Sequence, residues 1–557
     1  MTDWLHGTHA LLLAYSATQA PMFAGLLRAR AQFHQYALSP LVAAPLMLLA
    51  GLGAAASESV ITHSGLLTGL GLSVALGYAG GQSLARRKSD AKVHQRGSVV
   101  AEAAPPVKSR AKSADPDGSI TLAGVPVPAL DEAKHFKLIG TTGTGKSTAI
   151  REILGQALAR GDRAVIADPD GGYMERFYRR DRGDVVLNPF DSRSVKWDLF
   201  AEIKNDYDVE QLARSLIPDR DGQDRSWKAY ARTFFTAVTR QAREAGIKDA
   251  QELYRLLVVA DSSELRALVR GTPAQPFLDE HNSRMFDSIR SVTSSAVGAL
   301  EHISRQTSPS FSVRDWIDKE SPGVLFMPYK AGQIAALHST ISAWMRLAIF
   351  ETMDREVGTD REARADREAG SKNAGASTWL WFVIDELDAL GQIDGLKDAL
   401  ARLRKFGASC ILGFQSIAQV SNTYGHGEAH TIVENCGNTL ILRCSASEGG
   451  GTARFASQLI GEREVLRTTL SKSRRVTELW GSVTHSQQLA VESAVLPSQI
   501  EQLPDLSGYL KFASDPKWLS VRLDAKRAWE QHRSNPRTVD DAVPRRQPDK
   551  SAGTDRE

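Results

Sequence analysis

The chain has 557 residues, with 68 Lys and Arg against 65 Asp and Glu, so its formal net charge is only +3. This length allows more than one domain around a large buried core. The near-neutral balance excludes a protein coated in basic charge, so any contact with nucleic acid has to be local, as in a patch or the lining of a pore.

Cysteine and histidine usage excludes two further classes of protein. The three cysteines, Cys410, Cys436 and Cys444, are too few for a disulfide framework and show no CxxC spacing. We therefore expect buried free thiols in a reducing compartment. The 13 histidines show no HExxH or other ligand spacing, so no structural metal is predicted, and no GxSxG hydrolase signature is present.

Two uncharged stretches near the N-terminus have the length of membrane-spanning helices. They cover about 39–57 and 65–83, inside a predicted N-terminal membrane region 1–88. A helix needs about 20 apolar residues to cross the hydrocarbon core. Basic residues flank the pair, so the positive-inside tendency predicts a multi-pass protein with its bulk in the cytoplasm. A soluble helical hairpin is the alternative, and the stretch 10–27 is left open as an interfacial helix or a packing element.

The next part of the chain changes from a linker to an α/β pattern. Residues 89–118 are rich in Ala, Pro, Ser and charge, which is typical of a flexible linker. From 119 to 196 short apolar strands such as HFKLIG and RAVIAD alternate with a helical stretch that ends near Gly161. Strands that alternate with helices indicate a mainly parallel sheet.

Helical spacing replaces the strand signals between 197 and 310, and strand signals resume from 311 to 525. The sequence therefore predicts an α/β domain formed by 119–196 and 311–525, with an all-α domain inserted at 197–310. Two further stretches carry charge without apolar periodicity: 355–375, expected to be a mobile surface loop, and the tail 526–557, expected to be disordered.

The stretch GTTGTGKST at 140–148 matches the phosphate-loop pattern in full, after a strand and before a helix. Glycines let backbone N–H groups turn toward phosphate oxygens, and the helix N-terminus adds partial positive charge. Lys146 is expected to reach the β- and γ-phosphates of ATP, and the Ser147 hydroxyl to coordinate Mg²⁺. The predicted nucleotide-binding residues are Gly140, Thr141, Thr142, Gly143, Thr144, Gly145, Lys146, Ser147 and Thr148.

The stretch WLWFVIDELDAL at 379–390 is an apolar strand that ends in two carboxylates. A strand end next to the phosphate loop can hold Asp385 in the outer coordination shell of Mg²⁺. The predicted Mg²⁺-binding residues are therefore Ser147 and Asp385. Glu386 then has the position to orient and deprotonate the attacking water. Asp388 is expected to cap or solvate the segment that follows.

A second strand with polar flanks lies in ARLRKFGASCILGFQSIAQ at 401–419. Gln415 follows its apolar core, at the end where α/β sheets gather their ligands. It is predicted to sense the γ-phosphate, with surface hydrogen bonding as the alternative. Arg402 and Arg404 precede the strand and either complement a helix C-terminus or reach a neighbouring subunit's nucleotide as an arginine finger. Arg404 is our choice for the finger.

Five blocks of sequence together resemble the coupling proteins of conjugative type IV secretion systems, of the TraD/TrwB type. They lie in order between Gly140 and Gln419, and the middle block, with LNPFD and NDYD, is more specific than any phosphate loop. The blocks are GTTGTGKST, ADPDGGYMERFY, DVVLNPFDSRSVKWDLFAEIKNDYD, WFVIDELDAL and RKFGASCILGFQSIAQ.

This resemblance implies a RecA-like P-loop domain with an inserted all-α domain, preceded by a transmembrane helical hairpin. It also implies a homohexamer at the bacterial inner membrane that hydrolyses ATP in a DNA-dependent manner. Its partners would be DNA, a relaxase and the channel proteins of the secretion system. On this basis Gln415 corresponds to the family's glutamine after the next strand, and Arg404 to a proposed arginine finger.

The predicted function is an ATP-driven DNA translocase that recruits the relaxase–DNA complex to the channel during conjugation. Two alternatives remain open. One is a receptor that selects protein effectors for secretion, and the other is a DNA pump of the FtsK type, for which we expect more membrane segments and a winged-helix domain.

Overall fold

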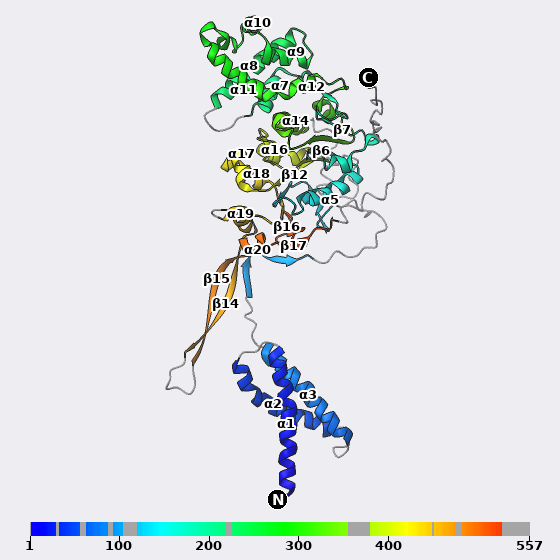
Figure 1. Cartoon of the computed structure of the whole chain (residues 1–557), viewed down its shortest axis with the longest axis vertical. Coiled ribbons are helices and arrows are strands. Elements are labelled where there is room, and N and C mark those ends of the chain that lie inside the picture. The colour runs from blue at the N-terminus through cyan, green and yellow to red at the C-terminus, as the bar shows by residue number, and fades with distance from the viewer. Residues whose placement is uncertain are drawn as a thin grey trace, which may run out of the picture. The chain divides into compact units, whose positions relative to one another are not determined.

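The computed structural model describes residues 2–28, 33–55, 63–86, 93–103, 120–218, 225–354, 379–447, 450–473 and 482–525 (Figure 1). The chain divides into two compact units, which are described separately below. One joins Met1–Arg96 to Glu464–Glu492, and the other joins Gly97–Arg463 to Ser493–Glu557. The predicted surface loop 355–375 and the predicted tail 526–557 lie outside the described residues.

The first unit begins with three helices, of which α1 and α3 pack closely. A Cβ added to Gly77 would lie 2.3 Å from the carbonyl oxygen of Thr18, and one added to Gly81 would lie 2.3 Å from that of Met22. Small residues of α3 thus let the two backbones touch, and the stretch left open at 10–27 is part of a packing helix. The helices are α1 (Thr2–Arg28), α2 (Phe33–Ala55) and α3 (His63–Arg86).

The two predicted membrane segments fall on α2 and α3, except that residues 56 and 57 lie outside the described residues. In the part of the chain that the structure describes, none of the helices combines the length and the apolar character that a bilayer crossing requires.

Two strands lie in the predicted linker 89–118, of which only 93–103 is described. One strand, β1 (Val93–Gly97), joins β14 (Glu462–Ser473) and β15 (Ser482–Ser493) in a three-stranded sheet. The other, β2 (Val100–Glu102), pairs in parallel with β17 (Trp518–Arg522). The expectation of a flexible linker is therefore corrected for this stretch, because partners far along the chain satisfy its backbone hydrogen bonds.

The second unit is built on a ten-stranded sheet with the order β2-β17-β16-β13-β5-β12-β11-β6-β10-β7. From β13 to β7 neighbouring strands are parallel, whereas β16 is antiparallel to both β13 and β17. The predicted α/β class is confirmed, and the mixed sheet fits a RecA-like fold. The remaining strands are β5 (Phe136–Ile139), β6 (Arg163–Pro169), β7 (Val185–Val186), β10 (Val324–Tyr329), β11 (Leu380–Ile384), β12 (Ala408–Phe414), β13 (Asn438–Ile441) and β16 (Ser507–Lys511).

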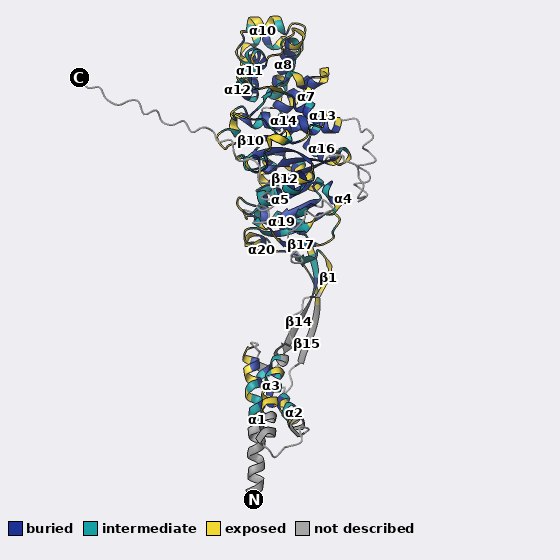
Figure 2. Ribbon diagram, turned by 90° about the vertical axis from the view of Figure 1, so that its right-hand side faces the viewer, coloured by how far each residue is buried: buried dark blue, intermediate teal, exposed yellow. Residues whose placement is uncertain are grey.

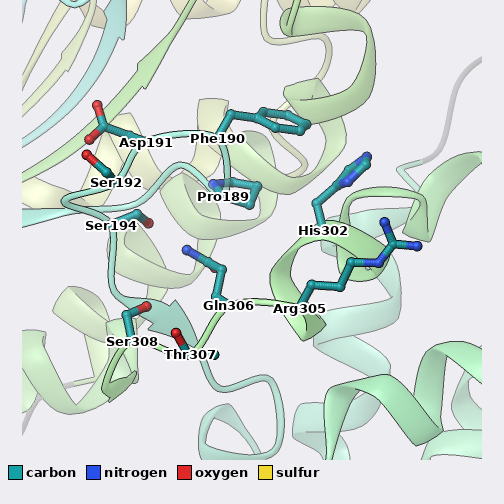
Figure 3. A pocket seen from close by; sticks show the side chains of 10 residues that line it. All are labelled: Pro189, Phe190, Asp191, Ser192, Ser194, His302, Arg305, Gln306, Thr307 and Ser308. Atoms are coloured by element: carbon teal, nitrogen blue, oxygen red, sulfur yellow. The ribbon is translucent and has the colours of Figure 1, made fainter. Parts of the chain in front are cut away.

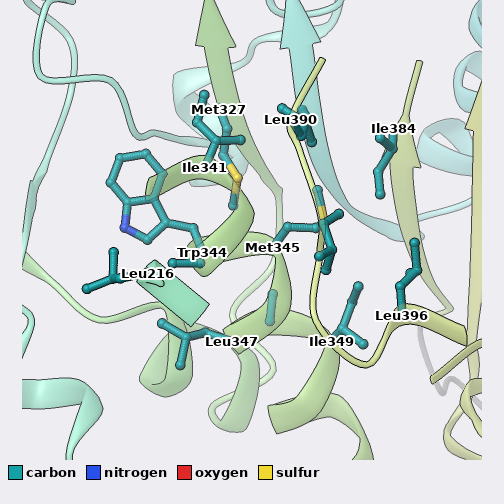
Figure 4. Packing of buried hydrophobic residues seen from close by; sticks show 14 of the residues in the cluster. Leu216, Met327, Ile341, Trp344, Met345, Leu347, Ile349, Ile384, Leu390 and Leu396 are labelled. Atoms are coloured by element: carbon teal, nitrogen blue, oxygen red, sulfur yellow. The ribbon is translucent and has the colours of Figure 1, made fainter. Parts of the chain in front are cut away.

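Helices cover both faces of this sheet, so its central strands are buried throughout (Figure 2). Successive residues of a strand point to opposite faces. On β11, Val383 packs with α5 (Lys146–Ala159) on one face, while Ile384 packs with α14 (Ile334–Asp354) on the other. Figure 4 shows the second of these layers, where Trp344, Met345 and neighbouring side chains of α14 meet the sheet.

Within the second unit, a helical region begins and ends at one place. The short strands β8 (Lys196–Trp197) and β9 (Ser310–Phe311) pair in parallel, with Lys196 opposite Ser310. Between them, all regular elements of the described residues are helices. The longer ones are α7 (Asp206–Leu216), α8 (Arg225–Glu244), α10 (Ser262–Leu268), α11 (Ser283–Val297) and α12 (Ala299–Ser304), with α9 (Ala250–Tyr254) continuing as a π-helical turn at Arg255–Val259.

A buried arginine on α14 ties this helical region to the segment after β11. The side chain of Arg346 is 4% exposed, and its guanidinium donates to the Asp394 carbonyl oxygen at 3.1 Å. The same group donates to Gln211 Oε1 at 2.7 Å and to Ser215 Oγ at 3.1 Å, both on α7. One side chain therefore contacts the inserted helices and the segment that follows the two carboxylates Asp385 and Glu386.

Candidate nucleotide-binding site

Residues 140–145 form a tight turn between β5 and α5, and 146–148 are the first residues of α5, as the phosphate-loop pattern predicts. Gly145 has φ 119°, a conformation that side chains rarely adopt, and a Cβ there would lie 2.9 Å from Leu506 and Leu523. The side chain of Lys146 folds back into the turn, where Nζ donates to the carbonyl oxygens of Gly140 (2.6 Å) and Thr141 (3.3 Å). Burial lowers the pKa of Lys146, and the charge of Asp385 opposes that shift. An ammonium held on two carbonyl oxygens is placed to exchange them for phosphate oxygens.

The structure brings Ser147 and Asp385 into direct contact. The Ser147 hydroxyl donates to Asp385 Oδ2 at 2.7 Å, although the two residues are 238 positions apart. The strands that precede the two residues are not neighbours in the sheet, because β12 lies between β5 and β11. Asp385 reaches across this strand at Gly413, where a Cβ would lie 2.2 Å from the Asp385 carbonyl oxygen. A glycine is therefore required on β12 at that position.

These two side chains offer the kind of oxygen ligands that Mg²⁺ prefers. Asp385 Oδ1 is buried and has no hydrogen-bond partner among the described residues. A buried carboxylate oxygen without a donor is costly, and a magnesium-bound water would satisfy it. The residues present therefore fit Mg²⁺, which Ser147 and Asp385 would hold.

Tyr173, which no sequence motif singled out, orients the same carboxylate. Its hydroxyl donates to Asp385 Oδ2 at 2.7 Å, and the side chain is 1% exposed. Asp168, at the end of β6, holds the turn that carries Tyr173, because its carboxylate accepts from the backbone N–H groups of Tyr173 (3.0 Å) and Met174 (2.6 Å). Burial raises the pKa of Asp168 to about 6, against the effect of these two hydrogen bonds. Tyr173 lies in the block ADPDGGYMERFY, which marks the segment as specific to the family. Nothing in that block indicates that the tyrosine hydroxyl binds Asp385.

Two polar side chains, Thr142 and Gln415, connect the phosphate loop to the second carboxylate, Glu386. Gln415, just after β12, donates through Nε2 to Glu386 Oε1 and accepts through Oε1 from the Thr142 hydroxyl at 3.0 Å. Burial, and next the charge of Asp388, raises the pKa of Glu386. A carboxylate with a raised pKa, within reach of the phosphate loop, suits the deprotonation of a water molecule. The predicted residues Lys146, Ser147, Asp385, Glu386 and Gln415 thus lie in one site.

Arg402 and Arg404 lie at the other edge of the sheet. Arg404 belongs to the 3-10 helix Leu403–Phe406, which precedes β12, whereas Gln415 follows β12, and both arginines are exposed. Buried His135 is hydrogen bonded to residues before and after this short helix. Its Nδ1 accepts from the Cys410 N–H at 3.0 Å, so Nε2 carries the proton that it donates to the Leu400 carbonyl oxygen at 2.7 Å. Burial and, to a smaller extent, the charge of Arg404 lower the pKa of His135 to about 4. Within one chain, neither arginine joins the site.

Comparison with known proteins places this geometry in context. The model of one family, the type IV secretion-system coupling protein DNA-binding domain, matches residues 119–524. The coupling protein TraD of Escherichia coli strain K12 is 28% identical over 435 residues, which cover 77% of this chain and 57% of TraD. A conjugal transfer protein TraG of Escherichia coli is 22% identical over 410 residues, which cover 67% of this chain and 62% of TraG. The chain thus spans less than two thirds of the length of either relative.

Solved structures of the bacterial conjugative coupling protein TrwB have the same fold. The unbound monoclinic form of TrwBΔN70 has a TM-score of 0.66 and 30% identity, over 78% of this chain and 94% of TrwB. TrwB with the ATP analogue ADPNP has a TM-score of 0.65 and 29% identity, over 78% of this chain and 95% of TrwB. A further TrwB structure contains ADP and Mg²⁺, with the same TM-score and identity.

Proposed function

The chain belongs to the type IV secretion-system coupling proteins, and from that premise we propose that it is an ATP-driven DNA translocase. It would recruit a DNA strand and its bound relaxase to the secretion channel during conjugation. The site described above would supply the energy by hydrolysing ATP. The observation that carries this proposal is the contact of Ser147 with Asp385 across β12, beside the hydrogen bonds that join Thr142, Gln415 and Glu386.

The position of each side chain suits one role in the proposed hydrolysis of ATP. Lys146 leaves the carbonyl oxygens of its own loop and binds the β- and γ-phosphates. Glu386 orients the attacking water and accepts its proton, and Gln415 links Glu386 to the phosphate loop and responds to the γ-phosphate. Ser147 and Asp385 would hold Mg²⁺, which supplies charge neutralisation on the phosphates. The TrwB structures with ADPNP and with ADP and Mg²⁺ support this choice of cofactors.

The proposal includes a ring of six identical subunits. Arg404 lies at the edge of the sheet opposite the phosphate loop, so it can reach a nucleotide only in a neighbouring copy. An exposed arginine beside a neighbour's γ-phosphate would act as an arginine finger, which stabilises the charge of the transition state. The domain boundaries 119–196 with 311–525 and 197–310 belong to the same proposal, and the short parallel pair β8–β9 supports them.

Attachment to the bacterial inner membrane is also proposed, on the uncharged stretches 39–57 and 65–83 and on the family resemblance. Cell fractionation measures it directly. The full chain is expected in the membrane fraction after a carbonate wash, and recovery in the soluble fraction would contradict this location.

ATP turnover with and without single-stranded DNA tests the motor function most directly. The full-length chain, purified with detergent present, is expected to hydrolyse ATP faster when DNA is added. The Lys146→Ala variant is the control for contaminating ATPases, because it loses the phosphate contact. If the ATP turnover rate of the wild type is the same with and without DNA in every oligomeric form, the motor function is contradicted. Such a result would favour a receptor for protein substrates.

A further inference from the structure

A pocket of about 390 Å³ lies between the loop at 188–194 and α12, away from the phosphate loop (Figure 3). The loop is the LNPFD block, to which the nucleotide chemistry assigns no role. Phe190 and Asp191 line the pocket on this side, and His302, Arg305 and Gln306 line it on the other. Figure 3 shows the Phe190 ring near the His302 ring and the Arg305 guanidinium below His302.

The loop that carries Phe190 is held in place by the buried side chain of Asn188. Its Nδ2 donates to the Pro328 carbonyl oxygen at 2.8 Å and to Gln333 Oε1 at 3.2 Å, and its Oδ1 accepts from the Phe190 N–H at 2.8 Å. The Asn188 N–H in turn donates to Ser194 Oγ at 3.0 Å. Because the turn is fixed at both ends, Phe190 has a defined position instead of folding into the core.

Phe190 remains 44% exposed, while its ring contacts His302 at a centroid distance of 4.7 Å and an interplanar angle of 55°. A partly exposed aromatic ring that lines a pocket from a fixed loop can serve as a platform on which a base stacks. The rim is polar, since Gln306 and Thr307 line the same pocket and can hydrogen bond to the edge of a planar ligand.

The two charged side chains that line the pocket, Asp191 and Arg305, are each in an ion pair. Asp191 lies 2.7 Å from Arg193, and Arg305 lies 2.5 Å from Glu301. An arginine whose charge is balanced by a neighbouring carboxylate attracts a phosphate group less strongly than an arginine without such a neighbour. A ligand of this pocket is therefore recognised by its flat apolar face and its polar edge more than by its charge.

We propose that this pocket binds one unpaired base of a DNA strand, stacked on Phe190. The inference rests on the proposed function, because a coupling protein that moves a single strand needs contacts that tolerate any sequence, and every base has a face that can stack. A second pocket of about 340 Å³ shares Phe190 and Asp191 and extends to Tyr329, at the carboxyl end of β10. A strand held at Phe190 would thus continue toward the edge of the sheet that carries the nucleotide site.

Binding of a fluorescent oligothymidylate to the full-length chain, followed by anisotropy over a range of salt concentrations, tests the proposal. Phe190→Leu keeps an apolar side chain but removes the aromatic face, and we expect it to weaken binding by about five-fold to 150-fold, the range for one stacked base. Phe190→Trp is expected to retain the wild-type affinity. The slope of log K against log salt should be the same in all three proteins, because no phosphate contact is lost.

The matched control is Tyr207→Leu, which removes another exposed aromatic ring (58%) from α7, away from the residues that line the pocket. It is expected to bind as the wild type does. Equal thermal unfolding midpoints of Phe190→Leu and the wild type verify that the fold is kept. Wild-type affinity in Phe190→Leu, a changed salt slope or an equal loss in Tyr207→Leu would overturn the stacking site alone, whereas a wild-type chain that binds no DNA would overturn the proposed function as well.

Discussion

The two edges of the central sheet carry different parts of the proposed ATPase. At the carboxyl edge, Ser147, Asp385, Glu386 and Gln415 are already joined by hydrogen bonds within one chain. At the amino edge, Arg404 is exposed, and the buried His135 fixes the element that carries it. One edge is a nearly complete site, whereas the other carries the exposed side chains of Arg402 and Arg404.

This difference follows from the parallel sheet itself. The carboxyl ends of parallel strands lie at one edge, so loops from distant parts of the chain meet there and can form a site. A residue that precedes a strand lies at the opposite edge and cannot join them. On the proposed mechanism, one chain would hold the nucleotide with its own residues, whereas Arg404 would reach a nucleotide only in a second copy.

The strongest test of the carboxyl edge removes its general base. Glu386→Gln keeps the size and the hydrogen-bonding capacity of the side chain but cannot accept a proton, so ATP turnover should fall at least about 100-fold. Lys146→Ala should have an effect of similar size. Phosphate release measures both, and an unchanged thermal unfolding midpoint shows that the fold is retained. Full turnover in both variants would contradict the assignment of this edge as the catalytic one.

Mixed assemblies test the amino edge. If Arg404 acts on a neighbour's nucleotide, increasing amounts of Arg404→Ala mixed with the wild type should lower the ATPase below the line expected for simple dilution. The matched control is Arg402→Ala, which removes a nearby exposed arginine and should follow the dilution line. The reverse result would assign the finger to Arg402, and linear dilution in both would remove the proposed division between the two edges.

A smaller effect is expected from the hydroxyl that orients Asp385. Tyr173→Phe removes the 2.7 Å hydrogen bond to Oδ2 and leaves the contact with Ser147. The Mg²⁺ concentration for half-maximal ATPase should rise about ten-fold, the lower end of the range for residues that orient metal ligands. Tyr178→Phe is the control, since its hydroxyl makes no hydrogen bond in the part of the chain described. An unchanged Mg²⁺ requirement in Tyr173→Phe would leave Tyr173 a purely structural role.

The smallest expected effect concerns pH. Burial and the charge of Asp388 raise the pKa of Glu386, and Glu386 must be ionised to accept a proton. The ATPase should therefore fall on acidification at a pH above the ordinary range of glutamate. Asp388→Asn removes one cause of the raised pKa, so this acidic limb should move to lower pH, whereas Asp398→Asn, an exposed residue of α16 (Leu396–Arg402), should leave it in place. A limb that stays in place in Asp388→Asn would contradict the electrostatic coupling.

The sequence predicts the parts of the site that depend on local spacing. The phosphate loop and the pair Asp385–Glu386 are recognisable because each combines a strand with specific residues at fixed distances. Tyr173 could not be found in this way, since its hydrogen bond to Asp385 joins residues 212 positions apart. The position of β12 between β5 and β11 is likewise a property of the whole sheet.

The same limit explains the linker. Residues 93–103 have no strong strand pattern and lie beside a Pro- and Ala-rich stretch, so a linker was the reasonable expectation. They form β1 and β2 because β14 and β17, more than 350 residues later, offer free strand edges. When a strand is stabilised mainly by a partner this far along the chain, its own residues need not have a strong strand pattern.

The burial of the three cysteines makes site-specific fluorescent labelling of this protein possible. Cys410, Cys436 and Cys444 are each at most 1% exposed, and burial raises the pKa of all three thiols. Alkylating dyes react with thiolates that they can reach, so the natural chain should stay almost unlabelled. A cysteine placed at Val259, a side chain of the inserted helices that is 65% exposed, would accept one fluorophore selectively. Its emission would report whether that region moves with each ATP hydrolysed.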